Sequence, residues 1–151
     1  MNIRKATLED VPQIVQLLAN DDLGRQREDF RNPLPNKYLN AFEKINSDQN
    51  QELVVLLNDS GLVIGTLQLS LIPYLTYQGG IRAQIEAVRV HESYRNLGIG
   101  AELIKWAIDR AKFKGAHVVQ LTTDKKRGAA LKFYEKLGFV PSHEGMKLHL
   151  N

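Results

Sequence analysis

The chain contains no cysteine, few aromatic residues (7%) and no apolar run that approaches the length of a membrane span. Without cysteine it can hold neither a disulfide framework nor a catalytic thiol, which fits a cytoplasmic protein. The N-terminus lacks a basic segment followed by an apolar core, so the sequence predicts neither secretion nor membrane insertion. We therefore expect a cytoplasmic localisation and no membrane partner.

Three further kinds of site lack support. The net charge of +3 is modest, and basic residues do not alternate with exposed aromatics as they do in nucleic-acid modules, so no nucleic-acid partner is expected. The histidines His91, His117, His143 and His149 do not cluster with acidic residues at metal-ligand spacing, and no metal is predicted. Ser93 lacks the context of a nucleophile elbow, so serine hydrolase chemistry is unsupported.

The length and the 43% hydrophobic content fit a single domain over residues 1–151. Apolar periodicity and turn signals predict a mixed α/β order: a strand, two helices, three strands, a helix, a strand, a helix and two strands. The expected strands are 2–6, 52–57, 62–72, 85–90, 117–123, 139–140 and 146–150. The expected helices begin near residues 11, 38, 101 and 127, and 20–35 is expected to be loop or irregular helix. The last two strands would form a closing hairpin with Met146, Leu148 and Leu150 on its inner face.

The stretch 85–103 reads as a strand, a polar turn and a helix whose first turn is rich in glycine. Gly98 and Gly100 let the backbone turn sharply and leave the first helical amides uncovered. Free amides and the helix dipole at an N-terminus suit a phosphate or pyrophosphate, and Arg95 can add a bidentate partner. A Walker loop is excluded because Ala101 follows Gly100, and the third glycine of a dinucleotide fingerprint is missing. A tight turn without a ligand remains the alternative.

Here the sequence resembles the GNAT superfamily of acetyl-coenzyme A-dependent N-acetyltransferases. Its signature Gln/Arg-x-x-Gly-x-Gly/Ala matches Arg95, Gly98 and Gly100. A second hallmark, A-x-x-F-Y-E-K-x-G-F, matches residues 130–139, and the opening I-R-x-A-T matches residues 3–7. Two motifs in the right order and separation are more specific than either one alone.

The resemblance implies a GNAT-like fold: a twisted, mostly antiparallel sheet flanked by helices, splayed between the fourth and fifth strands to admit the pantetheine arm. It also implies acetyl-coenzyme A (acetyl-CoA) as co-substrate and an amine as acceptor. The main chain of Val88 and Val90 would meet the thioester and pantetheine. The residues implied to bind the rest of the coenzyme are Arg95, Asn96, Leu97, Gly98, Ile99, Gly100, Ala101, Ala130 and Phe133.

One position departs from the family pattern. Many members have asparagine, which contacts the pantetheine, three residues before the alanine of the second motif, and here that position is Arg127. Together with Lys125 and Lys126, Arg127 could instead meet the 3′-phosphate of the coenzyme. A charge run at the start of a helix is otherwise simply solvated.

Glu86 is the candidate general base, since an alkylamine with a pKa of ~10.4 is protonated at neutral pH and must lose a proton before it attacks. Strand alternation predicts that Glu86 shares a face with Gln84, Val88 and Val90, where apolar neighbours would take water from its carboxylate. Family members frequently use a glutamate on this strand, directly or through water. The alternative is an ion pair with Arg82 or Arg89.

Tyr134 is the candidate acid. The resemblance places the tyrosine of the Phe-Tyr pair beside the coenzyme sulfur, where it protonates or hydrogen-bonds the leaving thiolate. The alternative is a core aromatic in the stripe formed by Ala130, Phe133, Tyr134 and Leu137.

The sequence thus predicts transfer of acetyl from acetyl-CoA to a primary amine by direct attack in a ternary complex. The rival hypothesis is a non-catalytic acyl-CoA-binding or sensor module on the same fold. The acceptor, a small molecule or peptide, would be shaped by residues 20–50 and 72–82, which carry no diagnostic pattern. A homodimer is possible.

Overall fold

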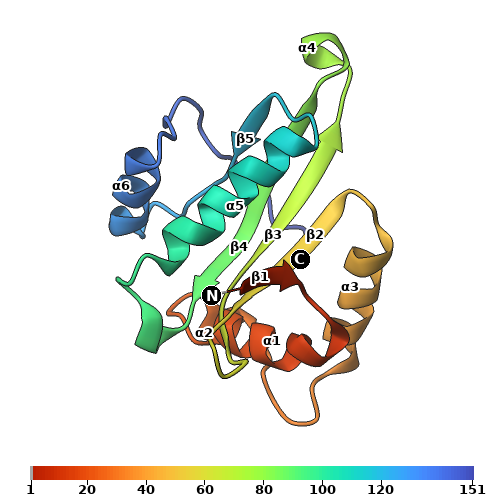
Figure 1. Ribbon diagram of the computed structural model, residues 1–151, viewed down its shortest axis with the longest axis vertical. Helices are drawn as coiled ribbons and strands as arrows, with labels where there is room; N and C mark the ends of the chain where they lie inside the picture. Colours follow the sequence, from red (N-terminus) through yellow and green to blue (C-terminus); the bar gives the residue numbers. More distant parts are fainter. Residues whose placement is uncertain (1) are drawn as a thin grey trace.

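The computed structural model describes residues 2–151, and within them five strands form one twisted sheet with the order β1-β2-β3-β4-β5 (Figure 1). Neighbouring strands run antiparallel, except that β4 and β5 are parallel. The strands are β1 (Asn2–Lys5), β2 (Gln51–Leu57), β3 (Val63–Pro73), β4 (Ile81–Val90) and β5 (Val118–Gln120). The predicted mixed α/β fold with a largely antiparallel sheet is confirmed.

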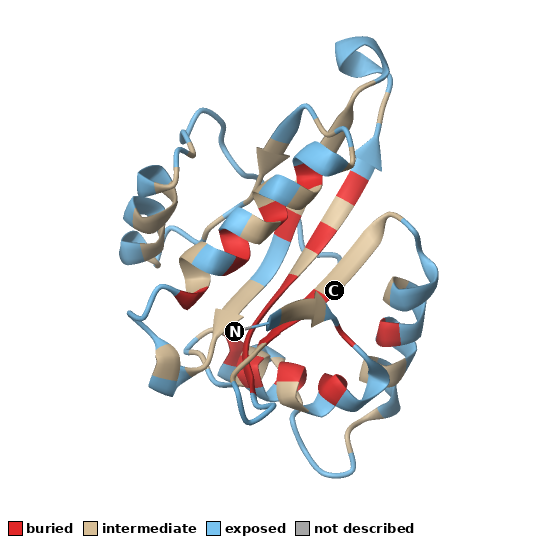
Figure 2. Cartoon of the chain, viewed as in Figure 1, coloured by how far each residue is buried: buried red, intermediate tan, exposed pale blue. Residues whose placement is uncertain are grey.

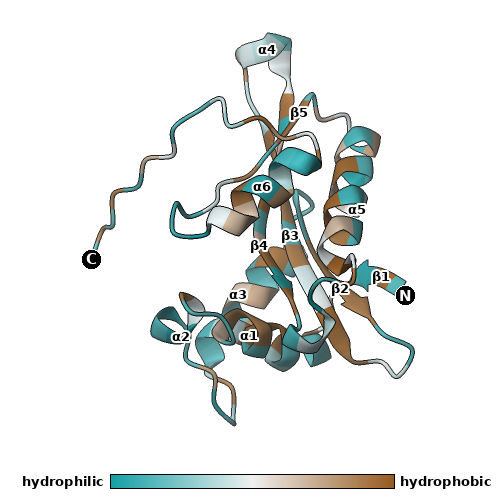
Figure 3. Cartoon of the chain, turned by 90° about the vertical axis from the view of Figure 1, so that its left-hand side faces the viewer, coloured by the Kyte–Doolittle hydropathy of each residue, from teal (hydrophilic) through white to brown (hydrophobic). Residues whose placement is uncertain are grey.

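Helices cover both faces of the sheet. Helices α1 and α3 pack on one face, and α5 packs along β3, β4 and β5 on the other (Figures 1 and 3). The helices are α1 (Val11–Ala19), α2 (Gly24–Arg27), α3 (Asn36–Ser47), α4 (Thr76–Gly79), α5 (Ile99–Phe113) and α6 (Gly128–Lys136), with short 3₁₀ turns η1 (Leu8–Asp10) and η2 (Glu92–Tyr94). In the described residues, no helix is both long and apolar enough to span a bilayer.

Strand alternation divides the core into two layers. On β2, Val54 and Leu56 belong to the apolar cluster beneath α5, whereas Val55 belongs to the cluster beneath α1 and α3. Successive side chains of a strand point to opposite faces, so one short apolar run supplies both layers. Figure 2 shows the buried residues concentrated along the central strands and the inner sides of α1 and α5.

Gly65 lies where α5 approaches the sheet most closely. A Cβ atom there would stand 2.9 Å from Leu103 Cδ1 and 3.2 Å from Ile99 Cγ2. The β2–β3 register also shifts next to it, between Leu56 and Leu57. The absence of a side chain lets the helix that carries the glycine loop sit directly on the sheet.

The sheet opens between β4 and β5. Their ladder covers Arg82 to Gln84, while β4 continues to Val90 alongside β3 on its other edge. The outer edge of the second half of β4 therefore has its main-chain groups free of β5. This is the splay that the sequence resemblance predicts.

Two expectations about the C-terminal third are wrong. Strand β5 spans Val118–Gln120 rather than 117–123. The predicted closing hairpin is absent from the described chain: residues 139–151 form neither strand nor helix, and Met146, Leu148 and Leu150 are 93%, 86% and 89% exposed. Within residues 2–151, no strand lies beside these three residues to pair with them.

Candidate coenzyme and acyl-transfer site

The glycine loop lies between η2 and α5. Asn96 and Gly98 have φ angles of 62° and 82°, which turn the chain so that α5 begins at Ile99. Gly98 occupies the N-cap position and has no side chain to satisfy the first amides of the helix. Arg95 is exposed beside it. The predicted anion-binding geometry, amides at the start of a long helix with an arginine nearby, is therefore present.

A surface hollow of about 460 Å³ starts at this loop and follows α5 toward the end of α6. It is lined by Gly98, Ala101, Glu102, Lys105, Ile108, Asp109, Lys112 and Leu137. The lining joins the two sequence motifs in space, because Gly98 and Ala101 belong to the first and Leu137 to the second. Lys105 and Lys112 place two cations along it.

Phe133 ties α6 to the glycine loop. A Cβ atom on Gly100 would lie 3.3 Å from Phe133 Cζ and 3.8 Å from Val90 Cγ2, so the ring, the loop and the end of β4 meet at this point. Phe133 and Ala130 are both half-buried. Of the predicted coenzyme residues, Val90, Gly100 and Phe133 thus form one contact group.

A bulge in β4 puts Glu86 and Val88 on opposite faces of the sheet. Glu86 pairs with Gln68 and Arg89 with Thr66, so the register shifts across Ala87 and Val88, and Ala87 has a φ of 54°. The extra residue moves Val88 to the α5 side, where it packs against the apolar cluster. The prediction that Glu86 shares an apolar face with Val88 and Val90 is wrong, because regular alternation stops at the bulge.

Glu86 instead belongs to a polar strip on the opposite face of the sheet, and its side chain is exposed. Its Oε1 accepts a hydrogen bond from Gln84 Nε2 at 3.1 Å, and Gln84 Oε1 accepts one from Gln120 Nε2 at 2.5 Å. The strip, which we define as Gln51, Gln68, Ser70, Gln84, Glu86 and Gln120, crosses β2, β3, β4 and β5. Among the described residues, Glu86 forms an ion pair with neither Arg82 nor Arg89, the two predicted partners. Arg89 binds Asp21 instead, and Arg82 stacks over the Tyr74 ring.

Tyr134 is half-buried between Phe133 and Phe139, with edge-on ring contacts at 5.1 and 5.9 Å. Burial raises the pKa of its phenol, and the positive charges of Arg89 and Arg127 act in the opposite direction. No group within residues 2–151 hydrogen-bonds its hydroxyl. Tyr134 is therefore a protonated phenol at neutral pH, as a proton donor must be.

The sequence interpretation missed the acidic member of an ion cluster that spans the opening of the sheet. Asp21, between α1 and α2, binds Arg89 of β4 and Arg127 at the start of α6: its Oδ2 lies 2.6 Å from Arg89 Nε and 3.0 Å from Arg127 Nη2. The Arg89 N–H is not aligned with that oxygen, since Nε is a buried atom without a hydrogen bond. Arg127, predicted to contact the coenzyme, is thus engaged by Asp21. Only chain folding brings these three distant positions together, so no local pattern could have indicated the cluster.

The cluster keeps Asp21 ionised. Burial by itself would raise the pKa of Asp21, but the hydrogen bond from the Gly24 amide (2.7 Å) and the charges of Arg127 and Arg89 outweigh it and lower the pKa to about 2. Burial also lowers the pKa of Arg89, and Asp21 opposes that effect. One carboxylate is shared by two guanidinium groups, which leaves positive charge near Tyr134.

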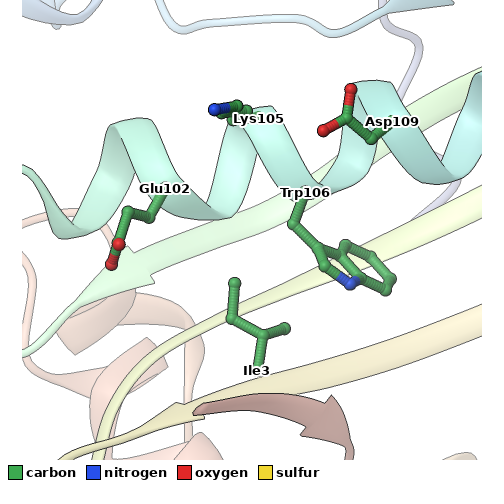
Figure 4. A pocket seen from close by; sticks show the side chains of 5 residues that line it. All are labelled: Ile3, Glu102, Lys105, Trp106 and Asp109. Atoms are coloured by element: carbon green, nitrogen blue, oxygen red, sulfur yellow. The ribbon is translucent and has the colours of Figure 1, made fainter. Parts of the chain in front are cut away.

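A second hollow, of about 230 Å³, lies between α5 and β1 and is lined by Ile3, Glu102, Lys105, Trp106 and Asp109, of which Glu102, Lys105 and Asp109 also line the first (Figure 4). The Trp106 side chain points from α5 toward the sheet, and none of the residues predicted to be catalytic lines this hollow. Over residues 2–151, no group of three or more histidine or acidic side chains is arranged to hold a metal ion.

A splayed sheet, a glycine loop at the start of a long helix and a tyrosine-bearing helix across the opening define the class of coenzyme A-dependent acyltransferase folds. The acetyltransferase (GNAT) family model matches residues 20–139, and the chain belongs to this family.

Two curated relatives are N-acetyltransferases. Glucosamine 6-phosphate N-acetyltransferase of Trypanosoma brucei brucei is 36% identical over 91 residues, which are 60% of this chain and 60% of the relative. Aminoalkylphosphonate N-acetyltransferase of Salmonella typhimurium is 28% identical over 93% of this chain and 86% of its own length. The match to the trypanosomal enzyme therefore spans well under two thirds of that protein.

Among solved structures, a protein described as a transcriptional regulator from Bacillus halodurans superposes with a TM-score of 0.96 at 53% identity, over 99% of both chains. A putative acetyltransferase from Agrobacterium tumefaciens superposes with a TM-score of 0.87 at 24% identity, again over 99% of both chains, and shows the shared fold.

Proposed function

We propose that this protein transfers an acetyl group from acetyl-CoA to a primary amine by direct attack in a ternary complex. The observation that carries the proposal is the placement of an uncapped α5 N-terminus beside a β4 edge that β5 leaves free. Amides of the loop from Arg95 to Ala101 would hold the pyrophosphate. The free main chain around Val88 and Val90 would hydrogen-bond the pantetheine, which aligns the thioester along β4.

The proposed reaction uses two side chains. Glu86, directly or through a water molecule, accepts the proton that the ammonium form of the acceptor must lose. The amine nitrogen then bonds to the thioester carbonyl carbon and loses its second proton to water, and the tetrahedral intermediate collapses by breaking the carbon–sulfur bond. Tyr134 gives its phenolic proton to the departing thiolate and regains one from water. The charges of Arg89 and Arg127 favour the negative sulfur before that proton arrives.

Substitution of Glu86 by glutamine tests the base. E86Q keeps the shape and the hydrogen bond with Gln84 but cannot take a proton, so turnover should fall about 10²- to 10⁴-fold. Raising the pH should restore part of the rate by supplying free amine. The measurement is coenzyme A release with a panel of primary amines. The matched control is D59N, which neutralises an exposed carboxylate in the β2–β3 turn. Wild-type turnover in E86Q would assign Glu86 a structural role.

The charges around the opening favour an acceptor that carries an anionic group. Arg89 and Arg127 bind the carboxylate of Asp21. Arg27 lies near enough to lower the pKa of Arg89, and its Nε is 3.9 Å from Glu28 Oε2. The two curated relatives carry a phosphate or a phosphonate in the names of their acceptors. We expect phosphate- or phosphonate-bearing amines to give a kcat/KM at least tenfold above that of uncharged analogues, with R27Q raising KM for the anionic acceptors alone. Equal kcat/KM across the panel would contradict this preference.

The alternative function is an acyl-CoA-responsive regulator, and it is favoured by the description of the Bacillus halodurans structure. A regulator would bind acetyl-CoA without turnover on any amine of the panel and would retard DNA in a salt-dependent mobility shift. If coenzyme A release depends on the added amine, the protein is an enzyme and not a regulator of this kind.

A further inference from the structure

The candidate base Glu86 lies where the β4–β5 ladder ends. The last pair of that parallel ladder is Gln84 with Gln120, and beyond it β4 continues without β5. Glu86 follows two residues after Gln84, so both side chains lie on one face of the sheet. The Glu86 side chain is exposed, and the bulge at Ala87 begins directly after it. Packing alone therefore does not hold this flexible side chain in one orientation.

Two hydrogen bonds in series reach the Glu86 carboxylate. Gln120 Nε2 donates to Gln84 Oε1 at 2.5 Å, and Gln84 Nε2 donates to Glu86 Oε1 at 3.1 Å. An ionised carboxylate only accepts hydrogen bonds, so Gln84 must turn its NH₂ group toward Glu86 and its Oε1 toward β5. Gln120 supplies the donor that this orientation requires. We call Gln120 and Gln84, which are both half-buried, the glutamine pair.

The other residues of the polar strip are bonded to one another and not to Glu86. Gln68 is the cross-strand neighbour of Glu86 on β3, yet its Nε2 donates to Gln51 Oε1 at 2.8 Å. Ser70 Oγ donates to the same Gln51 oxygen at 2.6 Å. Within residues 2–151, Gln84 is the only residue that hydrogen-bonds the Glu86 side chain. The strip thus contains two separate networks, and one of them ends on the candidate base.

We infer that Gln84, held by Gln120, is a positioning residue for the general base. This inference rests on the proposed role of Glu86. Gln84 Nε2 fixes one carboxylate oxygen of Glu86, which leaves Oε2 to accept the proton of the ammonium group or of an intervening water. Because Gln84 lies on β4 and Gln120 on β5, the glutamine pair sets the base relative to both strands that border the opening. A base already aligned when the acceptor binds lowers the barrier to proton transfer.

Substitution by methionine tests the glutamine pair, since methionine is also long and unbranched but has no amide. Q84M should lower kcat about tenfold in coenzyme A release with a primary amine, while KM for acetyl-CoA stays unchanged. Q120M should give a smaller loss of kcat, because Gln84 then keeps its bond to Glu86 but loses its own support. The control is Q68M, beside Glu86 on the same face, which should keep the wild-type kcat. A kcat of Q84M equal to that of Q68M would overturn the inference.

A double-mutant cycle with E86Q distinguishes positioning from a structural role. If Gln84 acts through Glu86, Q84M should cost about tenfold in the wild-type chain but less than about twofold when added to E86Q, because no base remains to be positioned. A loss of about tenfold in both backgrounds would show that Gln84 acts independently of Glu86 and would overturn the inference.

The same cycle keeps this inference apart from the proposed function. Slow turnover in E86Q together with wild-type turnover in Q84M would refute the positioning role alone and leave Glu86 as the base. Wild-type turnover in E86Q would refute the base, and the positioning role with it.

Discussion

Three properties of Tyr134 bear on its proposed role as proton donor to the thiolate. Its ring is held between two phenylalanines, its pKa is raised by burial, and two guanidinium groups stand near its hydroxyl. A residue that only fills the core would share the first property but has no need of the nearby cations. The ion cluster of Asp21, Arg89 and Arg127 therefore supports the proposed acid role of Tyr134 over the role of a core aromatic.

Substitution of Tyr134 by phenylalanine removes the hydroxyl and keeps the ring contacts. We expect kcat to fall about 10²-fold while KM for acetyl-CoA stays unchanged, because the lost interaction belongs to the transition state. The control is Y77F, which removes an exposed hydroxyl in the β3–β4 connection. A lower melting temperature with normal kcat would instead mark Tyr134 as a core aromatic.

Asp21 should make stability depend on acid pH. Its folded-state pKa of about 2 lies below the ordinary 3.8, so its ionised form stabilises the fold above pH 4, and this contribution is lost as pH falls from about 4 to 2. The shift corresponds to about 2 kcal/mol. Urea unfolding should show D21N less stable than wild type by about this amount at pH 7, with the difference shrinking below pH 4. D22N, at a neighbouring carboxylate that is 99% exposed, should lie within about 0.5 kcal/mol of wild type at both pH values.

At the scale of elements, α5 is the helix on which the coenzyme site depends. The absence of a side chain at Gly65 brings it onto β3, and Gly98 turns the chain into its first amides. The β4 bulge at Ala87 is the second local feature that shapes the site. It places Val88 and Val90 on the α5 side of the sheet and leaves Glu86 and Arg89 on the polar face. A bulge beside a site commonly redirects a side chain in this way.

Substitution of Gly98 by aspartate tests the anion site on α5. It would place a carboxylate against the amides proposed to bind the pyrophosphate, so the dissociation constant for acetyl-CoA should rise about 100-fold or more. G61D is the matched control: Gly61 has a φ of 84° against 82° for Gly98, and a Cβ at either position would meet no described atom within 4 Å. Both variants carry the same backbone strain, but calorimetry should show the loss of affinity for G98D alone. Equal affinities would refute the assignment of the loop.

At the scale of the molecule, the opening of the sheet is where segments far apart in the chain meet. Asp21 follows α1, Arg89 lies on β4 and Arg127 precedes α6, and the three side chains form one ion cluster there. The cluster thus links both ends of the chain to the splay that would receive the coenzyme.

The sequence by itself determined the family, the mixed α/β order, the glycine loop and the candidate pair Glu86 and Tyr134. These features depend on contiguous patterns: apolar periodicity, glycine at a strand–helix junction, and two motifs whose residues are neighbours in the chain. The sequence predicted the helix borders to within a few residues for the same reason.

Tertiary structure alone decided three matters. It placed Glu86 on a polar face, because one extra residue in β4 reverses the alternation that the prediction assumed. It joined Asp21 to Arg89 and Arg127, which lie far apart in the chain and meet only because α2, β4 and α6 converge at the splay. It also left residues 146–151 without a partner strand, since a period-2 pattern indicates a strand but does not specify the edge to which it pairs.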